Sequence, residues 1–378
     1  MNTKVVVFGL STEGYDLACK IALNGGDVHI IDESTPSAII IKPDIVKSYP
    51  NIQLLKDDEP ILSMVPIDVA ISKAQYLFFA PRLRKTGQEI KTELNSKFKD
   101  AVSKIKKGCS VVYCLGTGFG GNSENTLLLE HMTGLKTGKN VSYFYYPLNK
   151  LEEIPSFIGS YNGETDEKIV ELLSLGKTTK FVPIKTSEHL HAINTLKHFS
   201  ETTCILEVCK FAKDKTTKSD LNLNDLNEIY LDKMVDSLFD LRSLGNSFEG
   251  ASSMMYLING SLKGVDGYIK KLIDEIRLVL KKKELKASRT KIVLFWSLDT
   301  YEMKGEKHEK LDELETKLKD YISDVESIQD YKNIFQNDKT TIIVACSKSD
   351  YNSISKLKSD DQVIIIKANP LCEICTQK

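Results

Sequence analysis

Short apolar runs alternate with amphipathic patterns along the N-terminal part of the chain. The runs are rich in β-branched and aromatic residues, as is typical of strands that are covered on both faces in a parallel sheet. They predict strands at residues 5–8, 28–31, 38–41, 52–55, 76–80, 110–115 and 141–146, with helices at 89–105 and 124–132 among those between them. Strands alternating with helices predict an α/β fold with a doubly wound parallel sheet, whose ligands bind at the carboxyl ends of the strands.

The pattern changes in the middle of the chain to apolar residues at helical spacing. It predicts long helices at residues 187–213, 224–244 and 252–283. A second α/β pattern follows, with strands predicted at 291–298, 341–345 and 363–367 and a helix at 309–322. Because 378 residues exceed one ordinary core, we predict three domains. They are a Rossmann-type dinucleotide-binding domain (1–185), a helical middle domain (186–288) and a smaller Rossmann-like, nucleotide-binding-type domain (289–378).

The first strand ends in a glycine turn that resembles a dinucleotide-binding fingerprint. In G-x-G-x-x-G the glycines permit a tight turn, close approach of the pyrophosphate and close packing of the helix on the strand. Here the three positions are Gly9, Ser11 and Gly14. Serine at the middle position either donates a hydrogen bond to a phosphate oxygen or displaces the cofactor.

Asp32 follows the second strand, where an acidic residue binds the ribose 2′-hydroxyl of NAD. Glu33 beside it would repel a 2′-phosphate, so the expected cofactor is NAD and not NADP. The alternative is a Rossmann-like domain that binds no cofactor. Two further turns, at Pro81 and at the glycine-rich stretch 116–121, fall at the carboxyl ends of predicted strands.

Composition and charge narrow the classes of partner. The net charge is -1, with Lys and Glu mixed along the chain, so neither nucleic acid nor an anionic membrane would be attracted. No apolar run is long enough to span a bilayer, and the first residues do not resemble a signal peptide. We expect a cytoplasmic protein with no nucleic-acid or membrane partner.

Eight cysteines do not form a disulfide framework in a chain of this size. Four of them lie in apolar patterns, where a thiol acts as a small hydrophobe: Cys19, Cys109, Cys114 and Cys346. Cys372 and Cys375 have C-x-x-C spacing, but no second pair or histidine follows to complete a zinc site. This favours an exposed tail over a redox or metal role, and we predict no metal site.

The order of the three blocks and the glycine turn resemble the UDP-glucose/GDP-mannose dehydrogenase family. FFAPRLR, with Pro81, looks like the family's V-P-T loop. LKTGKNVSYFYYPLNKL is similar to G-L-K-x-G-x-D-F-x-L-x-x-S-P-E-R-L, and IPSFIGS is similar to P-x-x-V-G-G. The resemblance implies that the first domain binds NAD through Gly9, Gly14 and Asp32. It also implies a homodimer through the middle helices and a nucleotide or nucleotide-sugar site in the C-terminal domain.

The family's catalytic residues are mostly replaced. Its four-electron oxidation of an alcohol to an acid needs a cysteine nucleophile in a G-G-x-C loop, but no cysteine lies between Cys209 and Cys346. His191 and Thr195 stand where the E-L-x-K-x-x-x-N motif has lysine and asparagine, and Thr117 is one position out of register with the S-T-V-P threonine. Leu148 or Asn149 replaces the glutamate of S-P-E, and LDTYEMKGEKHE lacks the D-x-R-x-S signature.

Two hypotheses follow. The first is a divergent homologue without the catalytic thiol: a pseudoenzyme or cofactor-sensing binding protein. The alternative is an NAD-dependent oxidoreductase that removes two electrons from a CH-OH group of a nucleotide sugar or related alcohol. It would use neutral His191 as the base, with Thr117 as a second catalytic candidate. The competing interpretation of His191 is a partly exposed helix residue without a catalytic role.

Overall fold

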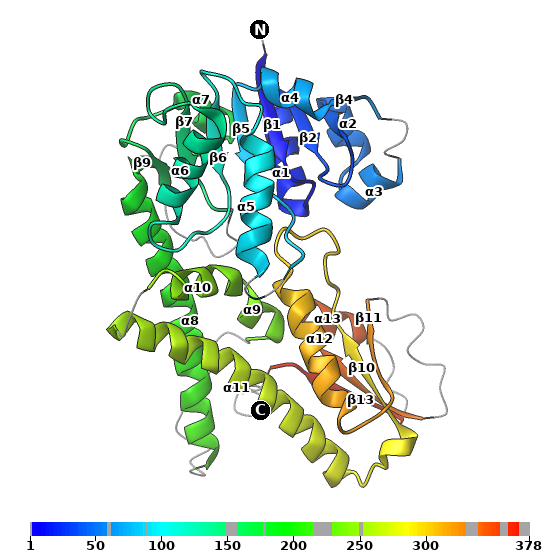
Figure 1. The fold of residues 1–378 in the computed structure, drawn as a ribbon. Helices are drawn as coiled ribbons and strands as arrows, with labels where there is room; N and C mark the ends of the chain where they lie inside the picture. The colour runs from blue at the N-terminus through cyan, green and yellow to red at the C-terminus, as the bar shows by residue number, and fades with distance from the viewer. Residues whose placement is uncertain are drawn as a thin grey trace. The chain divides into compact units, whose positions relative to one another are not determined.

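The computed structural model describes residues 2–58, 62–85, 87, 89–148, 157–176, 179–214, 229–248, 252–329, 339–355 and 362–369. The chain forms two compact units (Figure 1). The first comprises Met1–Asn194, Ser243–Glu249 and Asp299–Gly305, and the second comprises Thr195–Arg242, Gly250–Leu298 and Glu306–Lys378. The predicted boundaries of the three domains remain a prediction.

The first unit is built on a sheet whose described strands follow the order β4-β3-β2-β1-β5-β6-β7-β8-β9. Its central strands are parallel: β2 (Gly26–Ile31), β1 (Thr3–Phe8), β5 (Tyr76–Phe79), β6 (Ser110–Tyr113) and β7 (Ser142–Tyr145). Four strands extend the edges: β3 (Ser37–Ile41), β4 (Met64–Pro66), β8 (Phe157–Ser160) and β9 (Lys180–Pro183). Of these, β3, β4 and β8 each run antiparallel to the strand before them in the chain.

Strand order reverses between β1 and β5, because β2 lies on one side of β1 and β5 on the other. Right-handed crossovers in opposite directions place helices on both faces. Accordingly, α1 (Thr12–Leu23) contacts α2 (Pro43–Ser48) and α7 (Glu167–Leu172), whereas α5 (Glu89–Val102) contacts α6 (Gly121–Thr133). A shorter helix, α4 (Ile67–Lys73), contacts β1. The predicted α/β fold is confirmed.

The strand predicted at 52–55 is wrong, because this segment is helix α3 (Ile52–Asp57). The Asn51 side chain accepts a hydrogen bond from the Leu54 N–H and so caps the helix. Ile52 and Leu55 are buried, while Leu54 is 45% exposed. Burial at positions i and i+3 is typical of a helix. A run of four residues is too short to distinguish this spacing from that of a strand.

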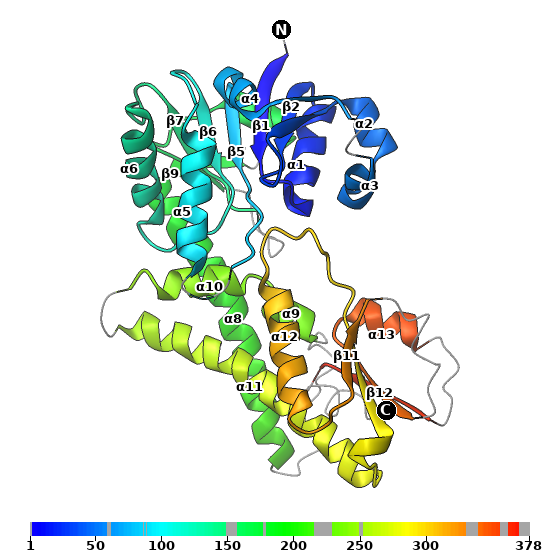
Figure 2. The same ribbon diagram turned by 45° about the vertical axis from the view of Figure 1, so that its right-hand side comes forward.

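The second unit contains long helices, as predicted (Figure 2). Helix α8 (Ile184–Asp214) begins in the first unit, and α11 (Ser253–Lys282) crosses it. The crossing is close, since a Cβ on Gly264 would lie 2.7 Å from Thr203 Oγ1. The helix predicted at 224–244 is instead α9 (Leu231–Val235) and α10 (Leu238–Gly245). Ser237 separates them with a φ of 66°, which is not helical.

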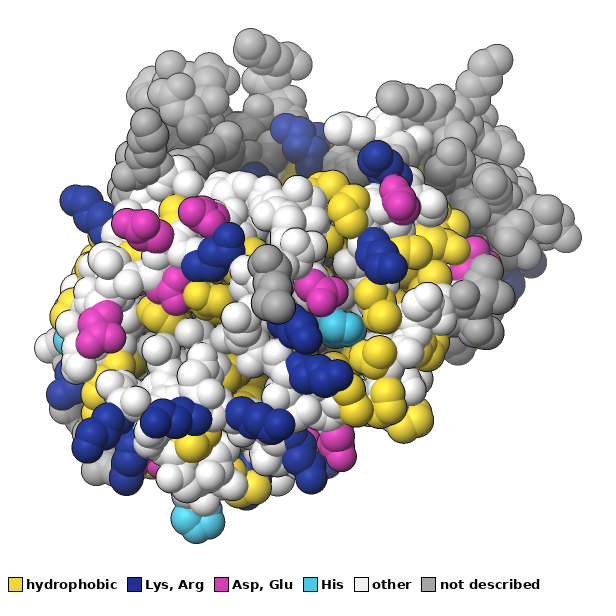
Figure 3. Space-filling view, turned by 90° about the horizontal axis from the view of Figure 1, so that it is seen from above, with side chains coloured by type: hydrophobic (Ala, Val, Ile, Leu, Met, Phe, Trp, Pro, Cys, Tyr) yellow, Lys and Arg dark blue, Asp and Glu magenta, His cyan; other side chains and the backbone are white. Residues whose placement is uncertain are grey.

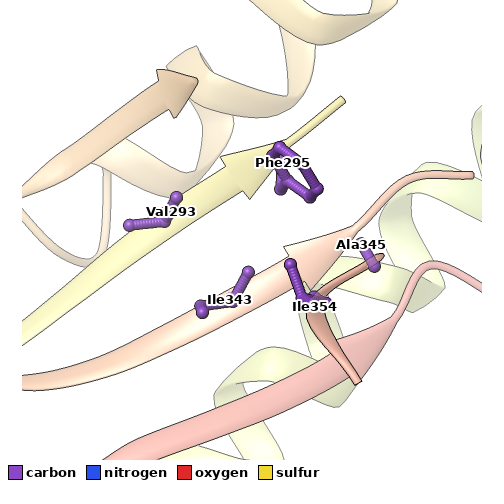
Figure 4. Packing of buried hydrophobic residues seen from close by; sticks show 5 residues of the cluster. All are labelled: Val293, Phe295, Ile343, Ala345 and Ile354. Carbon is purple, nitrogen blue, oxygen red and sulfur yellow. The ribbon is translucent and has the colours of Figure 1, made fainter. Parts of the chain in front are cut away.

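A smaller parallel sheet completes the second unit, with strand order β11-β10-β12-β13. Its elements are the 3₁₀ turn η3 (Ala287–Arg289), β10 (Thr290–Phe295), α12 (Glu306–Lys319), β11 (Val325–Ile328), β12 (Thr340–Ala345), α13 (Lys348–Ile354) and β13 (Val363–Lys367). Val293 and Phe295 of β10 and Ile343 and Ala345 of β12 form a buried cluster with Ile354 of α13 (Figure 4). The smaller C-terminal α/β sheet is confirmed.

Several predictions fall outside the described residues: the start of the helix predicted at 224, the first part of IPSFIGS, Asn149, and Cys372 and Cys375. No helix within the described ranges is long and apolar enough to cross a membrane. On the face drawn in Figure 3, Lys and Arg side chains are interspersed with Asp and Glu. That mixture accords with a net charge of -1.

Candidate functional site

The glycine turn after β1 lies at the switch point of the first sheet, beside the end of β5. Gly9 has a φ of 122°, and a Cβ there would lie 2.1 Å from the Ala80 carbonyl oxygen and 2.6 Å from Pro81 Cα. Only glycine fits this position. The structure therefore places Gly9 and Pro81 side by side at the edge where a Rossmann fold binds its ligand.

Ser11 is fully buried and serves as the N-cap of α1. Its Oγ accepts a hydrogen bond from the Gly14 N–H at 3.0 Å and donates to the Ala80 carbonyl oxygen at 3.4 Å. A Cβ on Gly14 would lie 2.4 Å from the Gly9 carbonyl oxygen, so that position also needs glycine. The serine hydroxyl is thus committed to the turn itself and points at the backbone, not outward to a ligand.

The segment Asp299–Gly305 covers the first turn of α1 within the same unit. The Thr12 N–H donates to the Tyr301 carbonyl oxygen at 2.8 Å. The Met303 N–H donates to the Glu13 carboxylate, also at 2.8 Å. The helix end that would face a pyrophosphate is therefore in contact with the chain's own backbone.

The same segment also contacts the loop that follows β5. The Leu83 N–H donates to the Met303 carbonyl oxygen at 2.8 Å. The Arg82 guanidinium lies 4.8 Å from the centre of the Tyr301 ring and donates to the Thr300 carbonyl oxygen. The Pro81 loop and the helix end are thus joined by one segment.

Asp32 ends the second strand, as predicted, but its carboxylate is engaged. Lys56 Nζ lies 2.6 Å from Asp32 Oδ2, and the Ser34 N–H and hydroxyl donate to Oδ1 at 2.9 and 2.7 Å. Burial alone would raise the pKa of Asp32, but the hydrogen bonds from Lys56 and Ser34 outweigh it, and the pKa falls below its usual value. The carboxylate is charged and its acceptor capacity is largely used.

Glu33 is paired in a similar way. Lys97 Nζ lies 2.6 Å from Glu33 Oε2, and the Arg82 N–H donates to Oε1 at 3.2 Å. Burial raises the pKa of Glu33 despite these contacts. Both acids therefore stand beside a lysine, which weakens the repulsion of a 2′-phosphate that the sequence alone suggested.

In this conformation the residues do not fit a dinucleotide. The Ser11 hydroxyl caps the helix, the Thr12 N–H is taken by Tyr301, and Asp32 is paired with Lys56. These three groups, which would face the phosphates and the ribose, are bonded to protein atoms. A dinucleotide could use them only after the protein groups move away.

A second polar cluster lies at the carboxyl ends of β6 and β7, around Glu188 on α8. Glu188 is 4% exposed, and its carboxylate accepts hydrogen bonds from the Gly120 N–H at 3.1 Å and the Asn122 N–H at 3.0 Å. Asn122 Nδ2 donates to Glu188 Oε1 and to Thr117 Oγ1, both at 2.9 Å. The Tyr143 hydroxyl donates to Asn122 Oδ1 at 2.8 Å. This buried network caps the start of α6 with a carboxylate.

The two predicted catalytic residues both lie at this cluster. The Thr117 N–H donates to the Tyr145 hydroxyl oxygen at 3.1 Å. The His191 ring, which is 6% exposed, packs edge-on against the Tyr145 ring with centroids 6.2 Å apart. The structure thus brings Thr117 and His191 to the same aromatic ring, and Tyr145 stands between them.

Aromatic side chains fill the adjoining turn. Phe119 packs against His189 at 5.3 Å and against Phe248 at 5.2 Å between ring centroids. A Cβ on Gly118 would lie 2.3 Å from the Ser243 carbonyl oxygen and 2.6 Å from Ser247 Oγ, so the turn also meets these two residues. The turn that follows Thr117 is therefore packed against other residues of this unit.

Sequence reasoning missed two groups of functional interest. Glu188 was considered only as the start of the segment matched to E-L-x-K-x-x-x-N, and Asn122 was not considered, although an Asn just after a glycine turn is a residue type that caps helices. The segment Asp299–Gly305 was noted only for its missing signature. Its docking joins positions far apart in the sequence, and no local pattern signals that.

The described cysteines do not supply a nucleophile at either cluster. Cys109, Cys114 and Cys346 are buried, Cys19 is half-buried, and Cys204 is exposed on α8. Burial raises the pKa of Cys109 to about 12 and that of Cys19 to about 11, which keeps both thiols protonated. Among the described residues, no group of three or more His, Cys, Asp or Glu could hold a metal ion.

Neither a family model nor a curated protein matches the chain. Solved structures do match over nearly the whole chain. The UDP-D-ManNAc dehydrogenase from Pyrococcus horikoshii is 14% identical, with a TM-score of 0.60, and the match covers 97% of this chain and 95% of that one. The UDP-glucose dehydrogenase from Pyrobaculum islandicum is 12% identical, with a TM-score of 0.61 and coverage of 97% and 86%.

The UDP-N-acetyl-mannosamine dehydrogenase Cap5O from Staphylococcus aureus is also similar, at 12% identity and a TM-score of 0.60, covering 98% of this chain and 100% of that chain. The chain therefore shares the α/β fold of these nucleotide-sugar dehydrogenases. The resemblance expected from the sequence is confirmed at the level of the fold, which by itself does not fix a function.

Proposed function

We propose that this chain is a binding protein on a nucleotide-sugar dehydrogenase fold that does not oxidise an alcohol to an acid. One observation carries the proposal: the buried network of Glu188, Asn122, Thr117 and Tyr143 fills the edge of the sheet where catalysis would occur. A catalytic carboxylate or hydroxyl must reach substrate. Here those groups are bonded to one another, which favours a structural role.

The cysteine chemistry supports the same proposal. Formation of an acid from an aldehyde requires a thiolate to hold the aldehyde as a thiohemiacetal. No cysteine lies between residues 209 and 346, where the family's nucleophile would fall. Two described cysteines have their pKa raised by burial, to about 12 for Cys109 and about 11 for Cys19, so neither replaces that nucleophile.

We further propose that the chain binds a ligand at the carboxyl edges of the sheets. The ligand is either a dinucleotide such as NAD or, as a separate class, a nucleotide sugar. Gly9 and Gly14 keep the tight turn of a dinucleotide-binding strand and helix. Asp32 remains charged at the end of β2. The two glycines and Asp32 support nucleotide binding, but they do not supply a catalytic group for hydride transfer.

A homodimer through the middle helices belongs to the same proposal. Helix α11 exposes Tyr256 by 72% and Leu257 by 45%, and Met254 by 37%, near its start. Exposed apolar side chains that adjoin one another are typical of an interface. Sedimentation of the wild type and of Tyr256→Glu tests this: a dimer that becomes monomeric supports it, and a wild-type monomer refutes it.

The experiment that tests the binding function combines binding and turnover. NAD and NADH are titrated calorimetrically into the wild type and Asp32→Ala, and UDP-glucose, UDP-N-acetylmannosamine and GDP-mannose are then incubated with the protein and NAD. We expect binding that weakens in Asp32→Ala and no uronic acid. Acid formation would refute the proposal that the chain lacks this oxidation, and no binding of any nucleotide would refute the binding function.

The second candidate function is a two-electron alcohol oxidation. The burial of His191 beside Tyr145, at the position of the family's catalytic lysine, favours it. Neutral imidazole could accept a proton from an alcohol. This candidate predicts NADH and a carbonyl product that disappear in His191→Ala but persist in His131→Ala, a change on exposed surface.

A further inference from the structure

We propose that the segment Asp299–Gly305 is an internal occupant of the cofactor end of α1, which a dinucleotide must displace in order to bind. The inference rests on the dinucleotide ligand of the proposed function. The segment belongs to the first unit, while the residues on either side of it, Leu298 and Glu306, belong to the second. It is therefore a separate stretch of chain docked onto the glycine turn.

The segment satisfies the groups that a pyrophosphate would otherwise meet. The first N–H groups of a helix have no partner within the helix and are natural anion donors. Ser11 Oγ caps the Gly14 N–H at 3.0 Å, and the Tyr301 carbonyl oxygen accepts from the Thr12 N–H at 2.8 Å. The Tyr301 carbonyl oxygen thus accepts the hydrogen bond that a phosphate oxygen would accept, but it carries no net charge.

Glu13 favours the docked segment over a bound phosphate. Its carboxylate accepts a hydrogen bond from the Met303 N–H at 2.8 Å and so holds the segment. The same negative charge also interacts favourably with the partial positive charge at the N-terminus of α1. If the segment left, Glu13 would place a negative charge beside an incoming phosphate. Docking the segment and binding a phosphate therefore compete at the same helix end.

Contacts on the segment's other side anchor it to the loop after β5. Met303 is 1% exposed, and its carbonyl oxygen accepts from the Leu83 N–H at 2.8 Å. Arg82 packs on the Tyr301 ring at 4.8 Å. Arg84 Nη1 donates to the Glu302 carbonyl oxygen at 3.3 Å. The segment is thus held by a buried side chain, a cation–π contact and backbone hydrogen bonds on two sides.

The experiment weakens the docking of the segment and leaves α1 and Asp32 unchanged. Tyr301→Ala/Met303→Ala removes the ring under Arg82 and the buried anchor, and Tyr301→Ala alone is the milder variant. Tyr321→Ala is the matched control, since it removes a similar ring contact, with Arg277 at 4.5 Å, in the second unit. Hydrogen exchange is followed in peptides covering residues 9–16 and 299–305, and NAD is titrated by calorimetry.

Without NAD, we expect the peptide that contains Thr12 to exchange at least tenfold faster in both segment variants than in the wild type and Tyr321→Ala. We expect NAD to bind the segment variants at least tenfold more tightly than the wild type. In the wild type, saturating NAD should speed exchange in 299–305. If the double variant does not fold, Tyr301→Ala and the wild-type exchange with NAD decide the matter.

Two contrary results can be told apart. If NAD binds the wild type while 299–305 stays protected, and the segment variants bind no more tightly, the competition is refuted and the binding function stands. If the segment variants exchange rapidly at Thr12 yet neither they nor the wild type bind NAD, the dinucleotide ligand of the proposed function is refuted.

Discussion

Asp32 and Lys56 form an ion pair at 2.6 Å, although Asp32 occupies the position expected to bind a ribose hydroxyl. The Asp32 side chain is 14% exposed and the Lys56 side chain 22%. The pair connects the end of β2 to α3, the segment that the sequence suggested to be a strand. Asp32 therefore has a structural partner in addition to any role in ligand binding.

Lys56→Met should lower the free energy of unfolding by about 1–2 kcal/mol, because it leaves a partly buried carboxylate without its cation. It should also raise the pKa of Asp32, since the hydrogen bond from Lys56 is part of what lowers it. Urea denaturation measures the first effect. Lys85→Met is the control, because its pair with Glu89 is exposed by 54% and 71%, and it should change stability by less than about 0.5 kcal/mol.

Gly14→Ala should destabilise the protein more than Ser11→Ala. Loss of the Ser11 cap costs about 1 kcal/mol, whereas a Cβ on Gly14 meets the Gly9 carbonyl oxygen at 2.4 Å and the backbone must shift. Thermal unfolding of both variants gives the comparison. The control is Gly260→Ala on α11, where no atom lies within 4 Å of the added Cβ. There the better helix propensity of alanine should stabilise by about 0.5–1 kcal/mol, and equal losses in all three variants would contradict this account.

Glu188→Ala should destabilise the first unit by about 3 kcal/mol, because it leaves the buried N–H and side-chain amide of Asn122, and the N–H of Gly120, without their acceptor. Glu188→Gln should cost less, since an amide oxygen still accepts one of these bonds. Chemical denaturation followed by circular dichroism measures both. In the exposed control Glu171→Ala, whose side chain is 65% exposed and pairs with Lys168, the loss should stay below about 0.5 kcal/mol. A Glu188→Ala protein as stable as this control would show that the network has no structural role.

Stability should fall as the pH drops below about 6.5. Burial lowers the pKa of both His29 and His198, so the unfolded chain binds more protons than the folded chain in that range. Well above the ordinary histidine pKa of 6.5 neither state binds these protons, and the loss of stability grows as the pH falls from about 6.5 toward the lowered pKa values of the folded protein. Melting temperatures at about pH 7.5 and about pH 5.5 measure the change, which His29→Gln/His198→Gln should reduce and His131→Gln, on exposed surface, should not.

The described thiols should differ sharply in reactivity. Cys204 is exposed and should be alkylated by iodoacetamide in the native protein, whereas buried Cys109, Cys114 and Cys346 should react only after denaturation. Burial raises the pKa of Cys109 to about 12, so at about pH 8 almost none of it is thiolate. Mass spectrometry of the labelled peptides locates the modified residues. Rapid native labelling of Cys109 or Cys114 would contradict the burial of these thiols.

The turn after β1 shows how far local pattern reaches. Gly9 and Gly14 were predicted from their spacing, because a tight turn and close helix packing each exclude a side chain. The role of Ser11 was left open between binding a phosphate and displacing one. Its Oγ makes neither contact but caps its own helix, and the sequence could not decide this because an N-cap and a ligand contact use the same hydroxyl.

The prediction of a strand at 52–55 was wrong for a related reason. A short apolar run has too few residues to distinguish a period of two from one of 3.6. The Asn51 cap and the burial of Ile52 and Leu55 settle it as a helix. Thr117 and His191 were chosen as catalytic candidates by comparison with the family's motifs, and only the fold shows that both contact Tyr145.

By itself the sequence determined the α/β architecture, the long middle helices and the glycine turn, because hydrophobic periodicity and steric exclusion act over a few residues. Tertiary structure alone decided that Asp32 meets Lys56, that Glu188 caps α6 and that Tyr301 covers Thr12. Each of these joins groups distant in the chain, and a hydrogen bond or ion pair depends on positions within a few ångströms that only the packed fold sets.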